Sequence, residues 1–280
     1  MSRPDEAARR QYWRDQLEAA TAFLGQCMDY PVAECGEPLV PLPEAAAAAN
    51  VRVRFSGTPI VGDLPRIFCL REGLLAPFLA AAKDMNRRGW VMLVEDGYRT
   101  REMQRSLGRK PAVFDTVLRR TVWEIGGGRP PLDLFMRRLT GMVATRPKIG
   151  THMSGSAIDI SVLEEDTGRE VDRGGAYLEM SELTPMASPF VSAEARRNRD
   201  AITALMAHHG FVAYPYEFWH YNSGDAYASI LNRTGRPGRY GAVDWNPSTR
   251  AVTAIADPCQ PLHDPADIEA AVSAAFARMA

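Results

Sequence analysis

The chain has 280 residues, of which 46% are hydrophobic and 24% are charged, as in an ordinary globular protein. A chain of this length can bury a full hydrophobic core, so its fold needs no framework of disulfides. The formal net charge is -1, which gives no electrostatic case for a nucleic acid or a membrane surface as a partner.

Hydrophobic periodicity and turn-forming residues predict helices with a few strands between them. Helices are expected at residues 4–24, 72–88, 100–107, 113–123, 133–145, 192–209 and 264–279. Strands are expected at residues 90–94, 157–163, 211–214 and 218–221. Residues 29–66 and 234–263 are rich in turns, and residues 165–190 form a long loop suited to shaping a pocket. Because helices and strands do not alternate regularly, the pattern favours an α+β fold with helices packed on an antiparallel sheet.

We expect a single domain over residues 1–280, with its core at about residues 50–245 and helical extensions at about residues 1–30 and 246–280. The first residues lack the basic-then-apolar pattern of a signal peptide. No apolar run is long enough to cross a membrane. These observations favour a cytoplasmic protein.

Three of the five histidines are not expected to bind a metal. His208 and His209 lie in the last turn of a predicted helix, where they would complement the helix dipole. His263 precedes the last helix and is expected to be exposed. The four cysteines have no Cys-x-x-Cys spacing, which argues against a thiolate metal site.

The other two histidines lie in segments that also carry carboxylates. His152 and Asp159 are separated by small residues that allow a tight turn, and Asp159 lies between two isoleucines. This alternation predicts a strand that directs Asp159 into a cleft and the isoleucines into a core. With His220, these residues could hold a zinc ion by three ligands and leave its fourth position for water. Glu217 would remain to move protons, so the site could activate water against an amide bond.

The spacing of Glu217 and His220 places their side chains on opposite faces of an ideal strand. Both can reach one metal only if the segment bends or leaves the strand between them. Structural roles are equally compatible with the residue types alone. His152 could be a turn residue, Asp159 a cap and Trp219 part of the core.

These segments resemble those of the zinc D-alanyl-D-alanine peptidases, in particular the D-Ala-D-Ala dipeptidases. The family's Ser-x-His-x-x-Gly-x-Ala-x-Asp segment is matched at residues 150–159, except that Gly150 replaces the serine. Its Glu-x-Trp-His segment is matched at residues 217–220, and its Asp-Gly-Tyr-Arg segment at residues 96–99. The resemblance covers roughly residues 50–245.

The resemblance implies one Zn²⁺ per chain, bound by His152, Asp159 and His220. It also implies that Glu217 is the catalytic acid and base. Arg99 would stabilise the charge that develops on the substrate's carbonyl oxygen.

The substrate contacts are expected at three further residues. Thr151 and Tyr98 lie beside the implied metal ligand and the implied catalytic arginine. The family has an acid after a phenylalanine that binds the substrate's free ammonium, but here Val191 follows the phenylalanine. Glu182, or otherwise Glu179, is expected to replace that acid.

We therefore expect a zinc-dependent peptidase that hydrolyses D-Ala-D-Ala-type dipeptides, with a small peptide as its partner. One alternative is a D,D-carboxypeptidase that acts on a longer peptidoglycan peptide. Another is a non-catalytic zinc-binding module, against which Glu217 and Arg99 count, because a structural site is normally closed by four ligands and needs neither residue.

Overall fold

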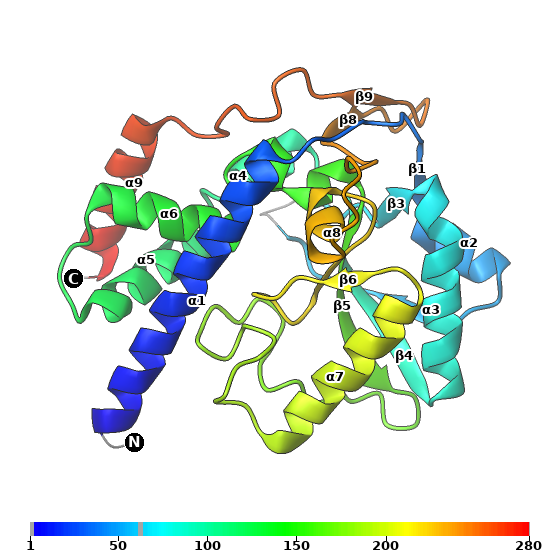
Figure 1. Cartoon of the computed structure of the whole chain (residues 1–280), viewed down its shortest axis with the longest axis horizontal. Coiled ribbons are helices and arrows are strands. Elements are labelled where there is room, and N and C mark those ends of the chain that lie inside the picture. The colour runs from blue at the N-terminus through cyan, green and yellow to red at the C-terminus, as the bar shows by residue number, and fades with distance from the viewer. Residues whose placement is uncertain (1–2, 61–63, 280) are drawn as a thin grey trace.

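A five-stranded sheet forms the centre of the computed structural model, which describes residues 3–60 and 64–279 (Figure 1). Its strands lie in the order β2-β4-β5-β7-β6. Their bounds are Val53–Phe55 (β2), Trp90–Asp96 (β4), Ala157–Glu164 (β5), His220–Asn222 (β7) and Val212–Ala213 (β6). The predicted α+β class is confirmed, and helices lie around the sheet.

The expectation of a wholly antiparallel sheet is wrong, because β2 runs parallel to β4 while the other pairs are antiparallel. Parallel neighbours need a crossover connection. Helix α3 (Leu75–Arg87) provides it between β2 and β4. The sequence did not indicate this pair, since β2 is only three residues long and lies in the segment read as turns.

The remaining elements are shorter or lie outside the sheet. The other helices are α1 (Arg3–Asp29), α2 (Leu42–Ala48), α4 (Arg101–Leu107), α5 (Pro111–Ile125), α6 (Leu132–Val143), α7 (Ala193–His208), α8 (Ala226–Leu231) and α9 (Pro265–Met279). Short 3₁₀ turns are η1 (Glu72–Leu74), η2 (Pro147–Ile149) and η3 (Thr151–Ser154). Two small antiparallel pairs join β1 (Leu39–Pro41) to β3 (Cys69–Arg71), and β8 (Val243–Trp245) to β9 (Val252–Ala254). Helices α2 and α8 were not predicted, because so few residues show no hydrophobic period.

Helices α3 and α7 pack on one face of the sheet and bury the main core with it. Phe78 of α3 and Leu205 of α7 belong to this core, together with Ile158 and Ile160 of β5. Side chains alternate along a strand, so Asp159 lies on the other face. The predicted alternation of β5 is therefore confirmed, and it assigns one face to the core and the other to the candidate site.

A second core lies among α4, α5, α6 and α9, on the side of the molecule away from α2 and α3 (Figure 1). The expectation that His263 is exposed is wrong, because only 5% of its surface is accessible. Its ring lies against Gly108, at the end of α4. The local sequence does not show which distant residues pack around His263, so its burial could not be predicted. Within the described residues, no helix is long and apolar enough to cross a membrane.

Candidate metal and catalytic site

The pairing of β5 with β7 brings the two sequence segments together. Asp159 lies opposite His220 in the antiparallel register. His152 precedes β5 in η3, and Gly155 turns the chain between them with a φ of 65°. A side chain at Gly155 would collide with Leu39, so the tight turn expected from the small residues depends on glycine here.

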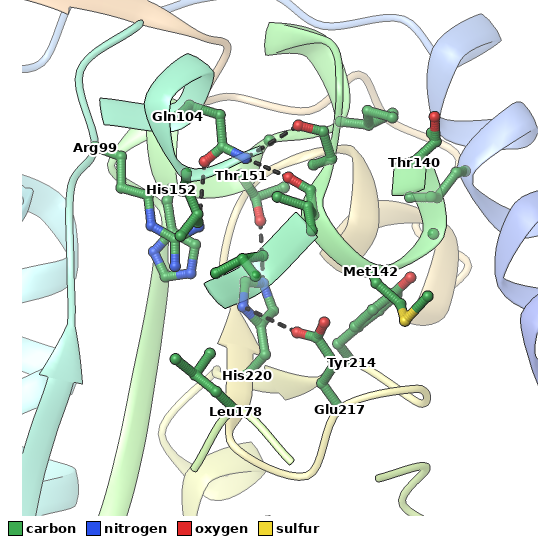
Figure 2. Close-up of a pocket in the computed structure, with 18 of the residues that line it drawn as sticks. Arg99, Gln104, Thr140, Met142, Thr151, His152, Leu178, Tyr214, Glu217 and His220 are labelled. Atoms are coloured by element: carbon green, nitrogen blue, oxygen red, sulfur yellow. Dashed lines mark hydrogen bonds and ion pairs between the residues drawn. The ribbon is translucent and has the colours of Figure 1, made fainter. Parts of the chain in front are cut away.

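The side chains of His152, Asp159 and His220 form a buried cluster whose candidate ligand atoms all lie within 4.8 Å of one another. Asp159 Oδ1 lies 3.2 Å from His152 Nε2 and 2.8 Å from His220 Nδ1. Figure 2 shows the two imidazoles among the residues that line a pocket. This is the two-histidine, one-carboxylate set that zinc takes when one position stays open.

In each imidazole, one nitrogen forms a hydrogen bond outside the cluster. The other nitrogen faces the cluster and can donate an electron pair to a metal ion. His152 Nδ1 lies 2.6 Å from the carbonyl oxygen of Gly97, so that nitrogen carries the hydrogen and donates it. His220 Nε2 lies 3.1 Å from Asn222 Oδ1 and 3.1 Å from Thr151 Oγ1, and we assign the hydrogen of this ring to Nε2, which donates to the Asn222 oxygen. Nε2 of His152, Nδ1 of His220 and Oδ1 of Asp159 therefore face one another as acceptors. A cation between these atoms would satisfy all three, and the donor set fits zinc.

The electrostatics of the cluster agree with this arrangement. Burial alone would raise the pKa of Asp159, but the two imidazoles hold it well below its usual range. Burial and the neighbouring Arg99 lower the pKa of His152, which favours the neutral ring that a metal requires. Burial acts the same way on His220, but the bond to Asp159 outweighs it and raises the pKa of that ring. A cation held between them, whether a proton or a metal ion, is thus favoured.

Glu217 reaches the cluster from the turn before β7. The chain bends there, as the spacing required, and Oε2 of Glu217 lies 4.0 Å from His220 Nδ1. Burial raises the pKa of Glu217 to about 7, although the nearby imidazole of His220 opposes the shift. A carboxyl group with this pKa can both accept and donate a proton near neutral pH.

Arg99 is buried beside the same cluster and is held by hydrogen bonds on two sides. Its Nε donates to Asp96 Oδ2 at 2.7 Å, and its Nη1 donates to Gln104 Oε1 at 3.1 Å. Its Nη2 lies 3.7 Å from Asp159 Oδ2. Two carboxylates thus compensate its charge, and the guanidinium has a fixed position on the pocket wall.

Three residues that support the cluster were missed in the sequence. Tyr177 donates its hydroxyl to Asp159 Oδ2 at 2.9 Å, and no periodicity or motif in the long loop marked it. Gln104, one helical turn beyond the cap of α4, also had no signal. Asn222 did have one, since it lies two positions after His220 and therefore on the same strand face.

A small pocket of about 70 Å³ lies beside the cluster. Arg99, His152, Glu217 and His220 line it, as does Thr151, one of the predicted substrate contacts. Leu178 from the long loop also lines it. Its φ of 63° is strained for a branched side chain, and it is 37% exposed.

The other two predicted substrate contacts are not on the wall of this cavity. Tyr98 is fully buried, and its hydroxyl donates to the carbonyl oxygen of Val243 at 2.8 Å. Glu182 accepts from Arg9 Nη1 of α1 at 2.7 Å. We correct both expectations: Tyr98 supports the turn that carries Arg99, and the Glu182 carboxylate is held by a cation of the protein itself.

The site has the parts that a metal-dependent hydrolase needs: a cluster of three donors, a separate carboxylate and a fixed cation on one pocket wall. A family model described as Peptidase M15, D-ala-D-ala dipeptidase, matches residues 134–235, which include the cluster. The chain is 30% identical over 169 residues to a D-alanyl-D-alanine dipeptidase of Enterococcus faecium, over 60% of this chain and 79% of that protein. It is 24% identical over 234 residues to a D-alanyl-D-alanine dipeptidase of Synechocystis sp., over 70% of this chain and 85% of that protein. The chain therefore belongs to the D-alanyl-D-alanine dipeptidase family.

A solved structure of an LD-carboxypeptidase is also similar, covering 74% of this chain and 79% of that chain at 16% sequence identity. Its TM-score against this chain is 0.37.

Proposed function

We propose that the protein is a zinc-dependent peptidase that hydrolyses D-Ala-D-Ala-type dipeptides. The observation that carries the proposal is the convergence of His152, Asp159 and His220 on one point, with Glu217 beside them. The relatives that are named as D-alanyl-D-alanine dipeptidases support the substrate class.

The residues of the pocket have separate roles in the proposed reaction. A zinc ion held by the cluster would act as a Lewis acid and lower the pKa of a water molecule that it binds. Glu217 takes a proton from the attacking water and passes it to the leaving amine. Arg99, kept in place by Asp96 and Gln104, stabilises the negative charge that develops on the carbonyl oxygen of the scissile bond.

A D,D-carboxypeptidase acting on a longer peptidoglycan peptide is the second candidate, and one observation favours it. A neighbouring pocket shares Leu178 and Glu217 with the first and extends to Trp13 and Leu17 of α1. Added residues of a longer substrate could occupy this space. The free ammonium of a dipeptide substrate would need a carboxylate partner in the pocket, because a buried ammonium without a partner is costly. Among the described residues, Glu179 is the carboxylate that lines the second pocket besides Glu217, and its Oε1 lies 3.6 Å from Arg120 Nη2.

The proposal is tested with the zinc-loaded protein and two substrates, D-Ala-D-Ala and N-acetyl-D-Ala-D-Ala, by following the release of D-alanine. We expect hydrolysis of the free dipeptide, and a loss of about 10²–10⁴-fold in turnover for Glu217→Gln with zinc retained. Glu194→Gln, which removes an exposed carboxylate on α7, is the matched control and keeps full activity. A preference for the acetylated substrate would favour the carboxypeptidase, and no hydrolysis of either would refute the proposal.

A further inference from the structure

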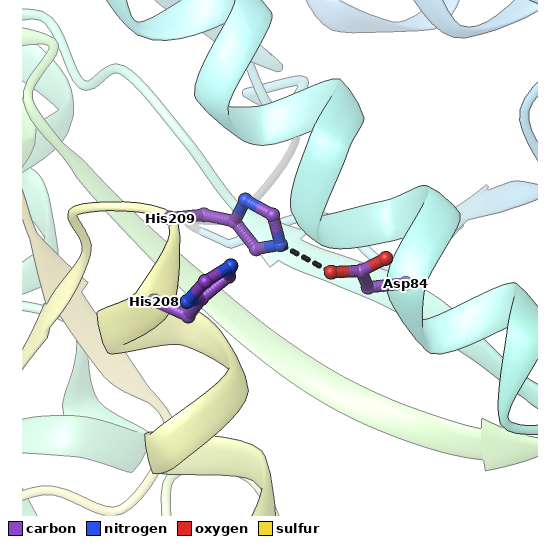
Figure 3. A group of neighbouring side chains, drawn as sticks. All are labelled: Asp84, His208 and His209. Atoms are coloured by element: carbon purple, nitrogen blue, oxygen red, sulfur yellow. Dashed lines mark hydrogen bonds and ion pairs between the residues drawn. The ribbon is translucent and has the colours of Figure 1, made fainter.

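A second group of metal-binding side chains lies between α3 and α7, away from the residues that line the pocket. It consists of Asp84 of α3, His208 of α7 and His209, the residue that caps α7 (Figure 3). One ligand atom from each residue lies within 4.8 Å of the other two. His209 Nε2 and Asp84 Oδ2 are 2.6 Å apart, so the two helices already meet at this point.

We propose that Asp84, His208 and His209 form a second, weaker site for a divalent transition-metal ion such as Zn²⁺, which ties the end of α3 to the end of α7. Two imidazoles and one carboxylate are again the donors that zinc prefers. Water would complete the coordination, because the group lies at the surface, with His208 exposed and the other two residues partly buried.

The ends of the two helices supply a further attraction for a cation. Asp84 lies in the last turn of α3, and His208 is the last residue of α7. The C-terminal end of a helix carries a partial negative charge, so it favours a cation and disfavours a carboxylate. Asp84 is therefore at the unfavourable end of its helix unless a positive charge lies next to it. Both helix ends and Asp84 would be stabilised by one metal ion.

The two oxygens of Asp84 have separate partners, which leaves one of them for the ion. Oδ1 forms an ion pair with Arg87 of the same helix. Oδ2 faces His209, whose Nε2 would turn from this hydrogen bond to the metal. The ring of His208 stands edge-on to that of His209, with centroids 4.9 Å apart. The three donors lie within 4.8 Å of one another, so a shift of these side chains would bring them onto one ion.

The sequence had indicated that His208 and His209 complement the helix dipole. That role needs a positive charge on the rings, whereas the proposed site supplies the charge with an ion. What the sequence could not show is that Asp84, on a helix far away along the chain, faces them. The site is expected to be weaker than the buried cluster, because binding must order an exposed side chain at His208.

The test is a calorimetric zinc titration of protein that has first been stripped with a chelator. The wild type should bind two equivalents, the second more weakly than the first. His208→Ala and Asp84→Asn should each weaken the second equivalent by at least about tenfold, since even outer-shell changes cost about 10–100-fold in metal affinity. Asp200→Asn, which removes an exposed carboxylate elsewhere on α7, is the control and should leave both equivalents unchanged.

A second measurement reports on the bridge between the helices. The second equivalent should raise the melting temperature of the wild type but not that of His208→Ala. A single equivalent in the wild type that His208→Ala also binds, or a second equivalent that survives both substitutions unchanged, would overturn the site. Failure of the buried cluster is distinguishable, because the wild type would then fall to one equivalent and His208→Ala to none.

Discussion

Replacing Tyr177 by phenylalanine should weaken zinc binding at the buried cluster without unfolding the protein. The hydroxyl of Tyr177 donates to Asp159 Oδ2 at 2.9 Å, whereas Nη2 of Arg99 lies 3.7 Å from that oxygen. Without the hydroxyl, Oδ2 of the ligand carboxylate loses its close hydrogen-bond partner, and the carboxylate is less firmly oriented. Loss of such an outer-shell bond typically costs about 10–100-fold in metal affinity. That factor corresponds to about 1.4–2.7 kcal/mol.

The affinity is measured by competition with a zinc chelator at fixed pH. Phenylalanine keeps the edge-on contact of the Tyr177 ring with Trp219, whose centroid is 5.7 Å away, so packing is preserved. Tyr12→Phe is the matched control, because the Tyr12 hydroxyl has no hydrogen-bond partner within the described part of the chain. Zinc affinity in Tyr177→Phe within twofold of wild type would refute the reasoning that Tyr177 supports the ligand.

Three further predictions follow from individual contacts. Arg99→Lys should lower kcat by at least about tenfold and leave the zinc content intact, because lysine loses the planar fork that binds Asp96 and Gln104; an effect on KM alone would make Arg99 a substrate anchor. Glu182→Gln should lower the free energy of unfolding by about 1 kcal/mol, because it weakens the pair with Arg9, and should leave KM unchanged; a raised KM would restore Glu182 to the substrate site. Burial lowers the pKa of His263 to about 4, so stability should fall as the pH drops from about 6.5 toward 4, where the unfolded chain binds the proton more tightly. In urea titrations His263→Leu should remove about 2–3 kcal/mol of that dependence, and an unchanged pH profile would contradict the assignment.

The sequence predicted the parts of the site that lie on or beside regular strands. Asp159 and His220 face the same way because β5 and β7 pair in register, and the alternation around Asp159 already indicated its face. The bend before His220 followed from its spacing to Glu217. These inferences needed only the local geometry of a strand.

The contacts made by the long loop could not be predicted in the same way. Loop residues have no period, so nothing in residues 165–190 distinguished Tyr177, which contacts Asp159, and Leu178, which lines the pocket, from Glu182. The partner of Glu182 is Arg9, in a helix at the other end of the chain, and only tertiary packing brings them together. The buried position of His263 and the parallel strand β2 have the same cause, since both depend on segments distant in sequence.

The most direct test of the central claim is the zinc dependence of D-Ala-D-Ala hydrolysis. Protein stripped with a chelator should release no D-alanine from the dipeptide, and activity should return in proportion to the first equivalent of zinc added. His220→Ala, which removes one ligand of the cluster, should neither bind that equivalent nor recover. Full hydrolysis by the metal-free protein, or full recovery in His220→Ala, would contradict the assignment of this cluster as the catalytic zinc site.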